Sequence, residues 1–156
     1  HFTSPIRRYP DTSIHRVLSA FVEGMPAEEV RRRYAQFCET SATESSRNEI
    51  RALIAERDAE DCYMAEYMSQ HIGEHFEGTV SGVTMRGVFV RLENSVEGFV
   101  SLDAFEDEDF VYDGLITQRS PKRELTIGTP LPIIVASAYV ATGKVDFVPD
   151  KEKLDI

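Results

Sequence analysis

Cysteine and long apolar runs are both scarce in this sequence. Cys38 and Cys62 are the only cysteines and lack metal-type spacing, so we expect two reduced thiols rather than a disulfide or a zinc site. No run of about 18 apolar residues occurs, so no segment is predicted to span a membrane. Reduced thiols are typical of the cytosol, so we expect the cytoplasm. The chain begins "HFTSPIRRYPD", without an initiator methionine or a signal-like segment.

Positive charge is also in short supply. The net charge is −10, of which −3 lies in residues 1–73 and −7 in residues 74–156. Lysine and arginine normally supply the phosphate attraction behind non-specific nucleic-acid binding. The charge balance therefore argues against loose binding to a polyanion, and any nucleic-acid role must depend on local sites. The remaining composition, 42% hydrophobic and 28% charged, is that of an ordinary globular protein.

The first half of the chain has a helical period. A helix is predicted from Pro10 to Gly24, because its apolar residues recur at steps of three and four. A second is predicted to begin at Pro26. A third is predicted to begin near Ser41, where "SATE" fits a capping box, and to end at Gly73. Its long apolar stripe is more typical of a core than of a binding surface.

The second half has a period of two. The segment "FEGTVSGVTMRGVFVRL" alternates around Gly82 and Gly87 as a curled hairpin would. Further short strand candidates follow, separated by glycine-bearing turns and by the acidic loop "DAFEDEDFVYD". This pattern favours a small closed barrel. We therefore predict an α+β fold with about three helices followed by a barrel, and no flexible linker between them.

Both halves resemble known sequences. "GEHFEGTVSGVTMRGVFVRLENSVEGFVSL" resembles an S1 domain, an OB-fold RNA-binding module. "HFTSPIRRYPDTSIHR", "AERDAED" and "EYM" resemble the end of the catalytic domain in the ribonuclease II/R exoribonuclease family, and the order of the parts is that of ribonuclease R. The resemblance implies that residues 1–73 are the C-terminal helical part of the RNB catalytic domain, residues 74–150 a five-stranded S1 barrel and residues 151–156 a tail.

The family resemblance also implies an activity. Its members are processive 3′-to-5′ exoribonucleases that use Mg²⁺ to release nucleoside 5′-monophosphates from single-stranded RNA. Their metal ligands are aspartates upstream of the matched segment, so the resemblance implies no metal ligand here and no activity for this chain alone. DNA and membranes are not expected partners. Two alternatives stay open: a free-standing RNA-binding adaptor without catalytic activity, and a structural remnant that does not contact RNA, which the acidic barrel would suit.

The N-terminal candidates are Arg7, Arg8 and Glu56. Adjacent arginines on a proline-fixed turn suit a phosphate, because each guanidinium presents a planar fork of donors. The resemblance implies that Arg7 holds the phosphate at the scissile bond, that Arg8 occupies a basic RNA-binding position and that Glu56, in "AERD", lies near the same catalytic site. A helical glutamate beside Arg57 is also typical of a solvated face or an ion pair.

The barrel candidates are Phe76, Arg86 and Phe89. The resemblance implies that the two phenylalanines lie on RNA-facing strands, where bases could stack on them, although a phenylalanine on a small barrel is as often a core residue. Arg86 and Ser101 replace an aromatic residue and a histidine of the family. Arg86 can still stack on a base or meet a phosphate. Because Arg86 and Phe89 differ by an odd step, a bend at Gly87 is expected to bring them together.

Overall fold

The computed structural model describes residues 2–106 and 108–154. The chain forms two compact units, His1–Glu56 and Arg57–Ile156, which we describe separately. In chain order the elements are α1 (Tyr9–Val22), α2 (Ala27–Ser69), β1 (His75–Thr84), β2 (Gly87–Leu92), β3 (Glu97–Ser101), the 3-10 helix η1 (Leu102–Ala104), β4 (Val111–Tyr112), β5 (Thr117–Arg119), β6 (Glu124–Thr126), β7 (Pro130–Tyr139), the 3-10 helix η2 (Val140–Thr142), β8 (Lys144–Pro149) and α3 (Lys151–Leu154).

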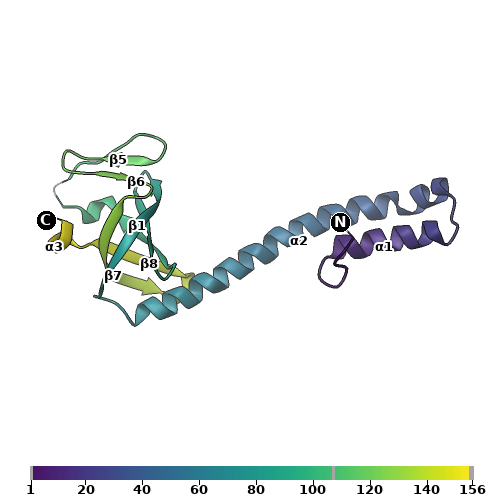
Figure 1. Cartoon of the computed structure of the whole chain (residues 1–156), viewed down its shortest axis with the longest axis horizontal. Helices are drawn as coiled ribbons and strands as arrows, with labels where there is room; N and C mark the ends of the chain where they lie inside the picture. The colour runs from purple at the N-terminus through teal and green to yellow at the C-terminus, as the bar shows by residue number, and fades with distance from the viewer. Residues whose placement is uncertain (1, 107, 155–156) are drawn as a thin grey trace. The chain divides into compact units, whose positions relative to one another are not determined.

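The first unit is a helical hairpin of α1 and the first part of α2 (Figure 1). Pro10 lies in the first turn of α1, where a missing N–H is tolerated. After α1, Gly24 adopts a φ of 98°, a left-handed conformation that glycine reaches without strain. The helices meet closely where the Oγ atoms of Ser13 and Ser41 share a hydrogen bond of 2.7 Å.

The predicted break at Ser41 is wrong. Helix α2 runs without interruption through 43 residues, and its sequence contains neither glycine nor proline. Ser41 is a buried interhelical contact rather than an N-cap. A helix break at Ser41 would leave backbone N–H and C=O groups without intrahelical partners, whereas the continuous helix keeps them paired and its small Ser41 side chain lets α1 approach. In the part of the chain that the structure describes, α1 and α2 precede the barrel and the short α3 follows it.

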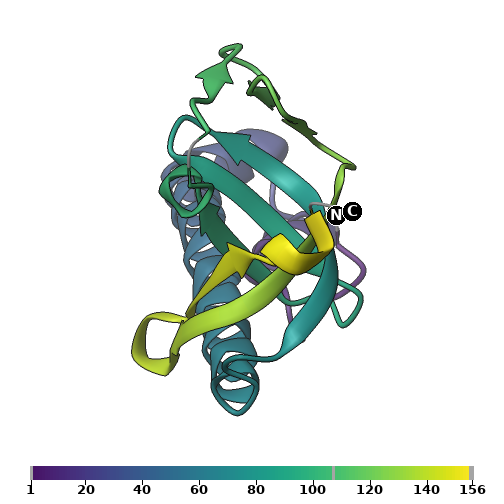
Figure 2. The same cartoon turned by 90° about the vertical axis from the view of Figure 1, so that its left-hand side faces the viewer.

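The second unit contains a closed barrel with the strand order β1-β2-β3-β8-β7 (Figure 2). All neighbouring pairs are antiparallel except β3 and β8, which pair in parallel. The predicted α+β fold with a five-stranded barrel is thereby confirmed. The strand β1 is irregular between Val80 and Gly82, where the register to β2 shifts, and such an irregularity increases the local twist that closure requires.

Alternation along the strands places one apolar set inside the barrel. Close packing leaves no room beside Gly98, where an added Cβ would overlap the ring of Phe147. The end of α2 covers the barrel core, since Ala65 and Met68 are fully buried in the same cluster as the strands. The buried apolar residues of the barrel strands are Val80, Val88, Val90, Leu92, Val100, Leu131, Ile133, Val135, Val145 and Phe147. Leu125 of β6, outside the barrel, belongs to the same core cluster.

A second, three-stranded sheet of β4, β5 and β6 is inserted between β3 and β7. It is tied to the barrel by Gln118, whose buried side chain donates from Nε2 to the carbonyl oxygen of Thr84 at 2.8 Å. Thr84 is the last residue of β1, so this bond supports the turn between β1 and β2.

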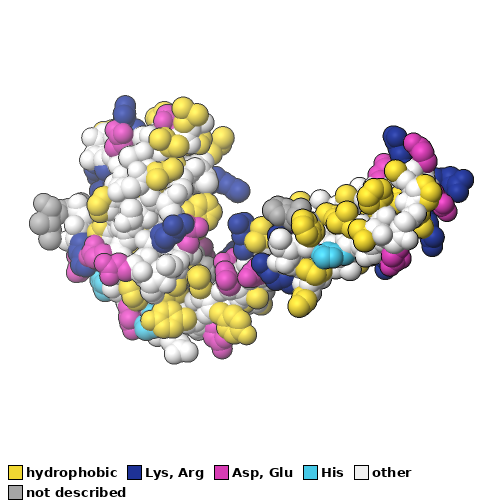
Figure 3. Space-filling view, turned by 45° about the vertical axis from the view of Figure 1, so that its right-hand side comes forward, with side chains coloured by type: hydrophobic (Ala, Val, Ile, Leu, Met, Phe, Trp, Pro, Cys, Tyr) yellow, Lys and Arg dark blue, Asp and Glu magenta, His cyan; other side chains and the backbone are white. Residues whose placement is uncertain are grey.

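Cys38 and Cys62 are both free thiols, as predicted. Within residues 2–106 and 108–154, no helix combines the length and apolar character needed to cross a bilayer. The helical hairpin nevertheless exposes apolar side chains, among them Leu18, Phe21 and Ile54, and Figure 3 shows hydrophobic side chains along its face. Such a surface is typical of one that packs against another protein segment.

Candidate nucleic-acid interface

A pair of aromatic rings lies on the outer face of the barrel. Phe89 on β2 is directly opposite Phe99 on β3 in the strand register. Their ring centroids are 5.3 Å apart and their planes are inclined by 59°. Phe89 also lies over Gly82, where an added Cβ would be 3.5 Å from its ring. Phe89 keeps 38% of its surface exposed, so the pair presents an open aromatic surface rather than a core contact.

Two adjoining hollows meet at this aromatic pair. One has a volume of about 1000 Å³ and the other about 530 Å³. Both are lined by Arg86, Phe89 and Phe99, and we call the two together the barrel groove. Its first half is further lined by Thr84, Met85, Ser101, Leu102 and Asp103, and its second half by Asp61, Glu97, Gly98, Thr142, Gly143, Lys144, Val145 and Asp146.

The backbone of Arg86 is fixed by hydrogen bonds in a tight turn, whereas its side chain forms none with a described residue. It lies in the two-residue turn between β1 and β2, because Thr84 pairs with Gly87. Thr84 donates from Oγ1 to the carbonyl oxygen of Gly87 at 2.8 Å, and Leu102 N donates to the carbonyl oxygen of Arg86 at 3.1 Å. The side chain of Arg86 is exposed, and no described residue bonds or pairs with its guanidinium. A fixed backbone with an unpaired guanidinium suits a phosphate or a base.

The structure brings Arg86 and Phe89 together, as the sequence predicted, but the predicted bend at Gly87 is not the cause. The register is regular at Gly87, and the irregularity of β1 lies between Val80 and Gly82. Arg86 reaches the groove because it lies in the turn before β2, where the alternation of a strand no longer applies.

Phe76 does not lie in the barrel groove. It occupies the same side of β1 as the buried Val80, and its ring packs against the barrel core. The ring of His71 meets it edge-on, with centroids 6.1 Å apart. A face shared by Phe76, Arg86 and Phe89 is therefore not formed. The aromatic partner of Phe89 is Phe99, which the sequence pattern does not predict. Its position opposite Phe89 depends on the length of the turn between β2 and β3.

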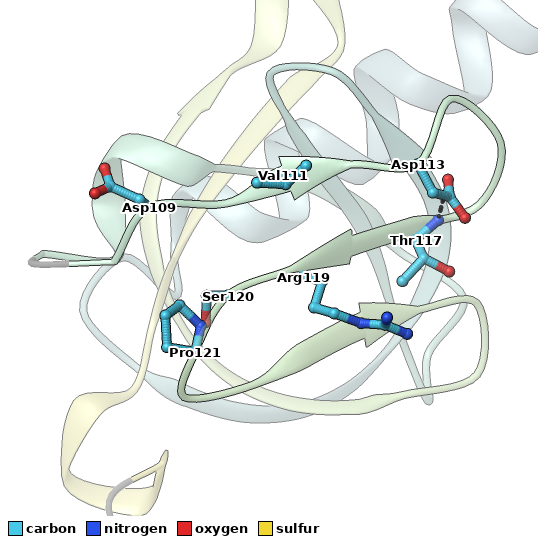
Figure 4. A pocket seen from close by; sticks show the side chains of 7 residues that line it. All are labelled: Asp109, Val111, Asp113, Thr117, Arg119, Ser120 and Pro121. Carbon is cyan, nitrogen blue, oxygen red and sulfur yellow. Dashed lines mark hydrogen bonds between the residues drawn. The ribbon is translucent and has the colours of Figure 1, made fainter.

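A further hollow lies on the exposed face of the three-stranded sheet, with a volume of about 750 Å³ (Figure 4). Its cation, Arg119, is bound to Glu124 by two hydrogen bonds of 2.8 and 3.0 Å. Asp113 accepts from three backbone N–H groups of the β4–β5 turn, which hold the pKa of its carboxyl below the ordinary value. The polar groups of this hollow thus serve the fold, and the barrel groove is the better candidate.

The paired arginines of the N-terminal turn have different surroundings. Arg8 donates from Nη2 to the buried carboxylate of Asp11 at 2.8 Å and to Oγ1 of Thr3 at 3.1 Å. The side chain of Arg7 is exposed and has no hydrogen bond or ion pair to another described residue. Glu56 is exposed on α2 and forms no ion pair with Arg7. The turn therefore presents one unpaired guanidinium and uses the other for its own structure.

Asp11 stabilises the turn that carries Arg7. Burial raises the pKa of its carboxyl, but hydrogen bonds from the Ser4 backbone N–H and from Arg8 outweigh burial, so the pKa lies below its ordinary value of 3.8. A depressed pKa means that ionised Asp11 stabilises the fold at neutral pH, and that this contribution is lost as the pH falls below 3.8 through the folded-state value.

We expect the amide proton of Ser4 to lose its protection from exchange with solvent as the pH is lowered below 3.8, through the depressed pKa of Asp11 in the folded state. The reason is that protonated Asp11 binds Arg8 and Ser4 N–H less strongly. The Asp11→Asn variant should show this loss already at neutral pH. Amide exchange followed by NMR measures both, and protection that is independent of pH and of the substitution would contradict the assignment.

Among residues 2–106 and 108–154, no three histidine, cysteine, aspartate or glutamate side chains converge as the ligands of a metal ion would. The described residues thus do not fit a resident magnesium site.

The barrel and its groove define a class of protein, the OB-fold barrels that bind oligonucleotides or oligosaccharides on one outer face. The chain belongs to the S1 RNA binding domain family, whose model matches residues 69–147. It is 38% identical over its whole length to ribonuclease R 1 of Lactococcus lactis, covering 20% of that protein. It is also 38% identical over 94% of its length to ribonuclease R of Ureaplasma parvum, covering 21% of it.

Solved structures agree with this match. Apo RNase R of Mycoplasma genitalium is similar with a TM-score of 0.86 and 28% identity over 96% of the chain, covering 24% of that structure. The same enzyme in complex with ribose methylated single-stranded RNA gives a TM-score of 0.85. The resemblance to ribonuclease R predicted from the sequence is confirmed, and the chain spans about a fifth of the length of the curated relatives it matches.

Proposed function

We propose that this chain is the C-terminal part of a ribonuclease R-like, processive 3′-to-5′ exoribonuclease that hydrolyses RNA to nucleoside 5′-monophosphates in the cytoplasm. The match to ribonuclease R along the whole chain carries this proposal. Residues 1–73 are then the helical end of the RNB catalytic domain, residues 74–150 the S1 domain and residues 151–156 a tail.

The S1 domain binds single-stranded RNA in the barrel groove and guides it toward the catalytic domain. Phe89 and Phe99 supply faces on which any base can stack, and the unpaired guanidinium of Arg86 contacts a phosphate. Few cations line the groove, namely Arg86 and Lys144. Binding is therefore weak and only shallowly dependent on salt, with a slope that corresponds to one or two phosphates. DNA and membranes are not partners.

Arg7 holds the phosphate of the scissile bond. Charge builds on the non-bridging oxygens during hydrolysis, and a fixed guanidinium stabilises that charge. Arg8 supports the turn through Asp11 and is a secondary RNA contact. Glu56 lies near the same phosphate and orients Arg7 or limits how tightly product is held. Magnesium belongs to the remainder of the enzyme, whose aspartates are its ligands.

We expect the 156-residue chain alone to bind single-stranded RNA without hydrolysing it. The described residues include no grouping of carboxylates that could hold two metal ions about 3.5–4 Å apart, as phosphodiester cleavage requires in two-metal sites. The measurement is incubation of end-labelled RNA with the chain and magnesium or manganese, beside a complete ribonuclease R as positive control. Stepwise release of mononucleotides by the chain alone would contradict the assignment of catalysis to the rest of the enzyme.

A second candidate is an RNA-binding adaptor without a catalytic parent. The observation in its favour is that the barrel groove lies entirely within one compact unit, Arg57–Ile156, and so needs nothing outside that unit to bind RNA. The coding sequence upstream of residue 1 distinguishes the two: an aspartate-rich catalytic segment there supports the exoribonuclease, and its absence supports the adaptor.

A further inference from the structure

One carboxylate stands beside the aromatic pair in the same row of the sheet. Asp146 on β8 is in register with Phe99 across the parallel β3–β8 pair, as Phe99 is with Phe89 across β2 and β3. The row thus runs across three strands on the outer face of the barrel. Asp146 lines the same half of the groove as both rings, and adjacent strands are about 4.8 Å apart. A base lying on Phe99 therefore has Asp146 at its edge.

The carboxylate of Asp146 is oriented by one hydrogen bond, but it forms no ion pair with a described residue. Ser137 lies on the neighbouring strand β7, opposite Asp146. It donates a hydrogen bond from Oγ to Oδ2 of Asp146 at 3.1 Å. No hydrogen bond from the described residues reaches Oδ1, and no described cation forms an ion pair with this carboxylate. Glu97 in the same half of the groove differs, because it accepts from Ser81 Oγ and from Arg91. Asp146 thus keeps a free acceptor next to the aromatic pair.

An ionised carboxylate can only accept hydrogen bonds. Cytosine offers it the amino group at N4, whereas uracil presents a carbonyl oxygen at the same position, and carboxylates are known partners of the cytosine N4 amino group. The two pyrimidines have the same size, so stacking on Phe99 favours neither. We propose that Asp146 is a specificity-determining residue that makes the barrel groove prefer cytidine over uridine in single-stranded RNA. The preference rests on the proposed function, because it requires RNA in this groove.

The test compares binding of the full chain to oligo(C) and oligo(U) of about 12 nucleotides by fluorescence anisotropy at one salt concentration. The wild-type chain should bind oligo(C) about five- to tenfold more tightly than oligo(U). Asp146→Asn should reduce this ratio to below about twofold, since an amide can donate to the uracil oxygen as well as accept from the cytosine amine.

Glu97→Gln is the matched control, because it removes one negative charge from the same half of the groove. It should raise the affinity for both oligonucleotides by the same factor and leave their ratio unchanged. If Asp146→Asn behaves in that way too, Asp146 only repels phosphates and the proposal is overturned. Equal binding of oligo(C) and oligo(U) by the wild-type chain overturns it as well, while leaving RNA binding intact. Binding of neither oligonucleotide overturns both this inference and the proposed function.

Discussion

Replacing Arg7 by alanine in the complete enzyme should lower kcat by about 10²–10³-fold and leave the Kd for RNA nearly unchanged. The guanidinium of Arg7 is exposed and unpaired among the described residues, so its removal leaves no buried charge behind and disturbs no local contact. Its contribution grows as charge develops on the phosphate, which places the effect in the transition state rather than in binding. Single-turnover kinetics and an RNA titration of the same variant measure the two quantities.

Arg7→Lys and Arg8→Ala are the controls. Lysine keeps the charge but lacks the planar fork of donors, so Arg7→Lys should restore only part of kcat. Arg8→Ala removes the partner of the buried Asp11 and should lower the stability of the N-terminal turn, because an unpaired buried carboxylate is unfavourable. An Arg7→Ala variant with a raised Kd and an unchanged kcat would make Arg7 a binding residue only.

The sequence predicted the barrel more accurately than the helices, for a physical reason. Alternation of apolar and polar residues specifies which side of a strand is buried, and a one-residue error would expose the whole apolar set. The sequence pattern therefore predicts correctly which side chains of the strands around Val80 and Val90 are buried. A capping pattern carries no such penalty, because "SATE" is also compatible with a helix interior. The continuity of α2 at Ser41 depends on packing against α1, which periodicity alone cannot show.

The candidate interface could be predicted only in part. The resemblance predicts Arg86 and Phe89 as interface residues, and both line the groove. Phe99 and Asp146 were missed because their positions depend on which strands pair and in what register, and the β3–β8 pair joins segments far apart in the sequence. For Phe76 the sequence leaves an RNA-facing and a core position open, and the alternation of β1 favours the core, because Phe76 shares a side with the buried Val80.

Phe89→Ala should weaken the binding of single-stranded RNA to the full chain by about 1–3 kcal/mol, because a stacked base loses its aromatic face. The melting temperature should fall little, since 38% of Phe89 is exposed and its ring packs on the surface residues Gly82 and Phe99. Phe89→Leu preserves most of the apolar contact but not the flat ring, so it should lose nearly as much RNA affinity. Anisotropy titration and thermal melting of each variant give both numbers.

Phe76→Ala is the matched control, since it removes the same side chain from the neighbouring strand. Its ring packs against the barrel core, so the substitution should destabilise the barrel by about 3 kcal/mol, at the low end for phenylalanine because the ring is only half-buried. RNA affinity measured well below its melting temperature should stay close to that of the wild type. The opposite pattern, with Phe89→Ala melting early and Phe76→Ala losing RNA, would exchange the two assignments. It would move the interface from the outer face of β2 and β3 to the start of β1 beside His71.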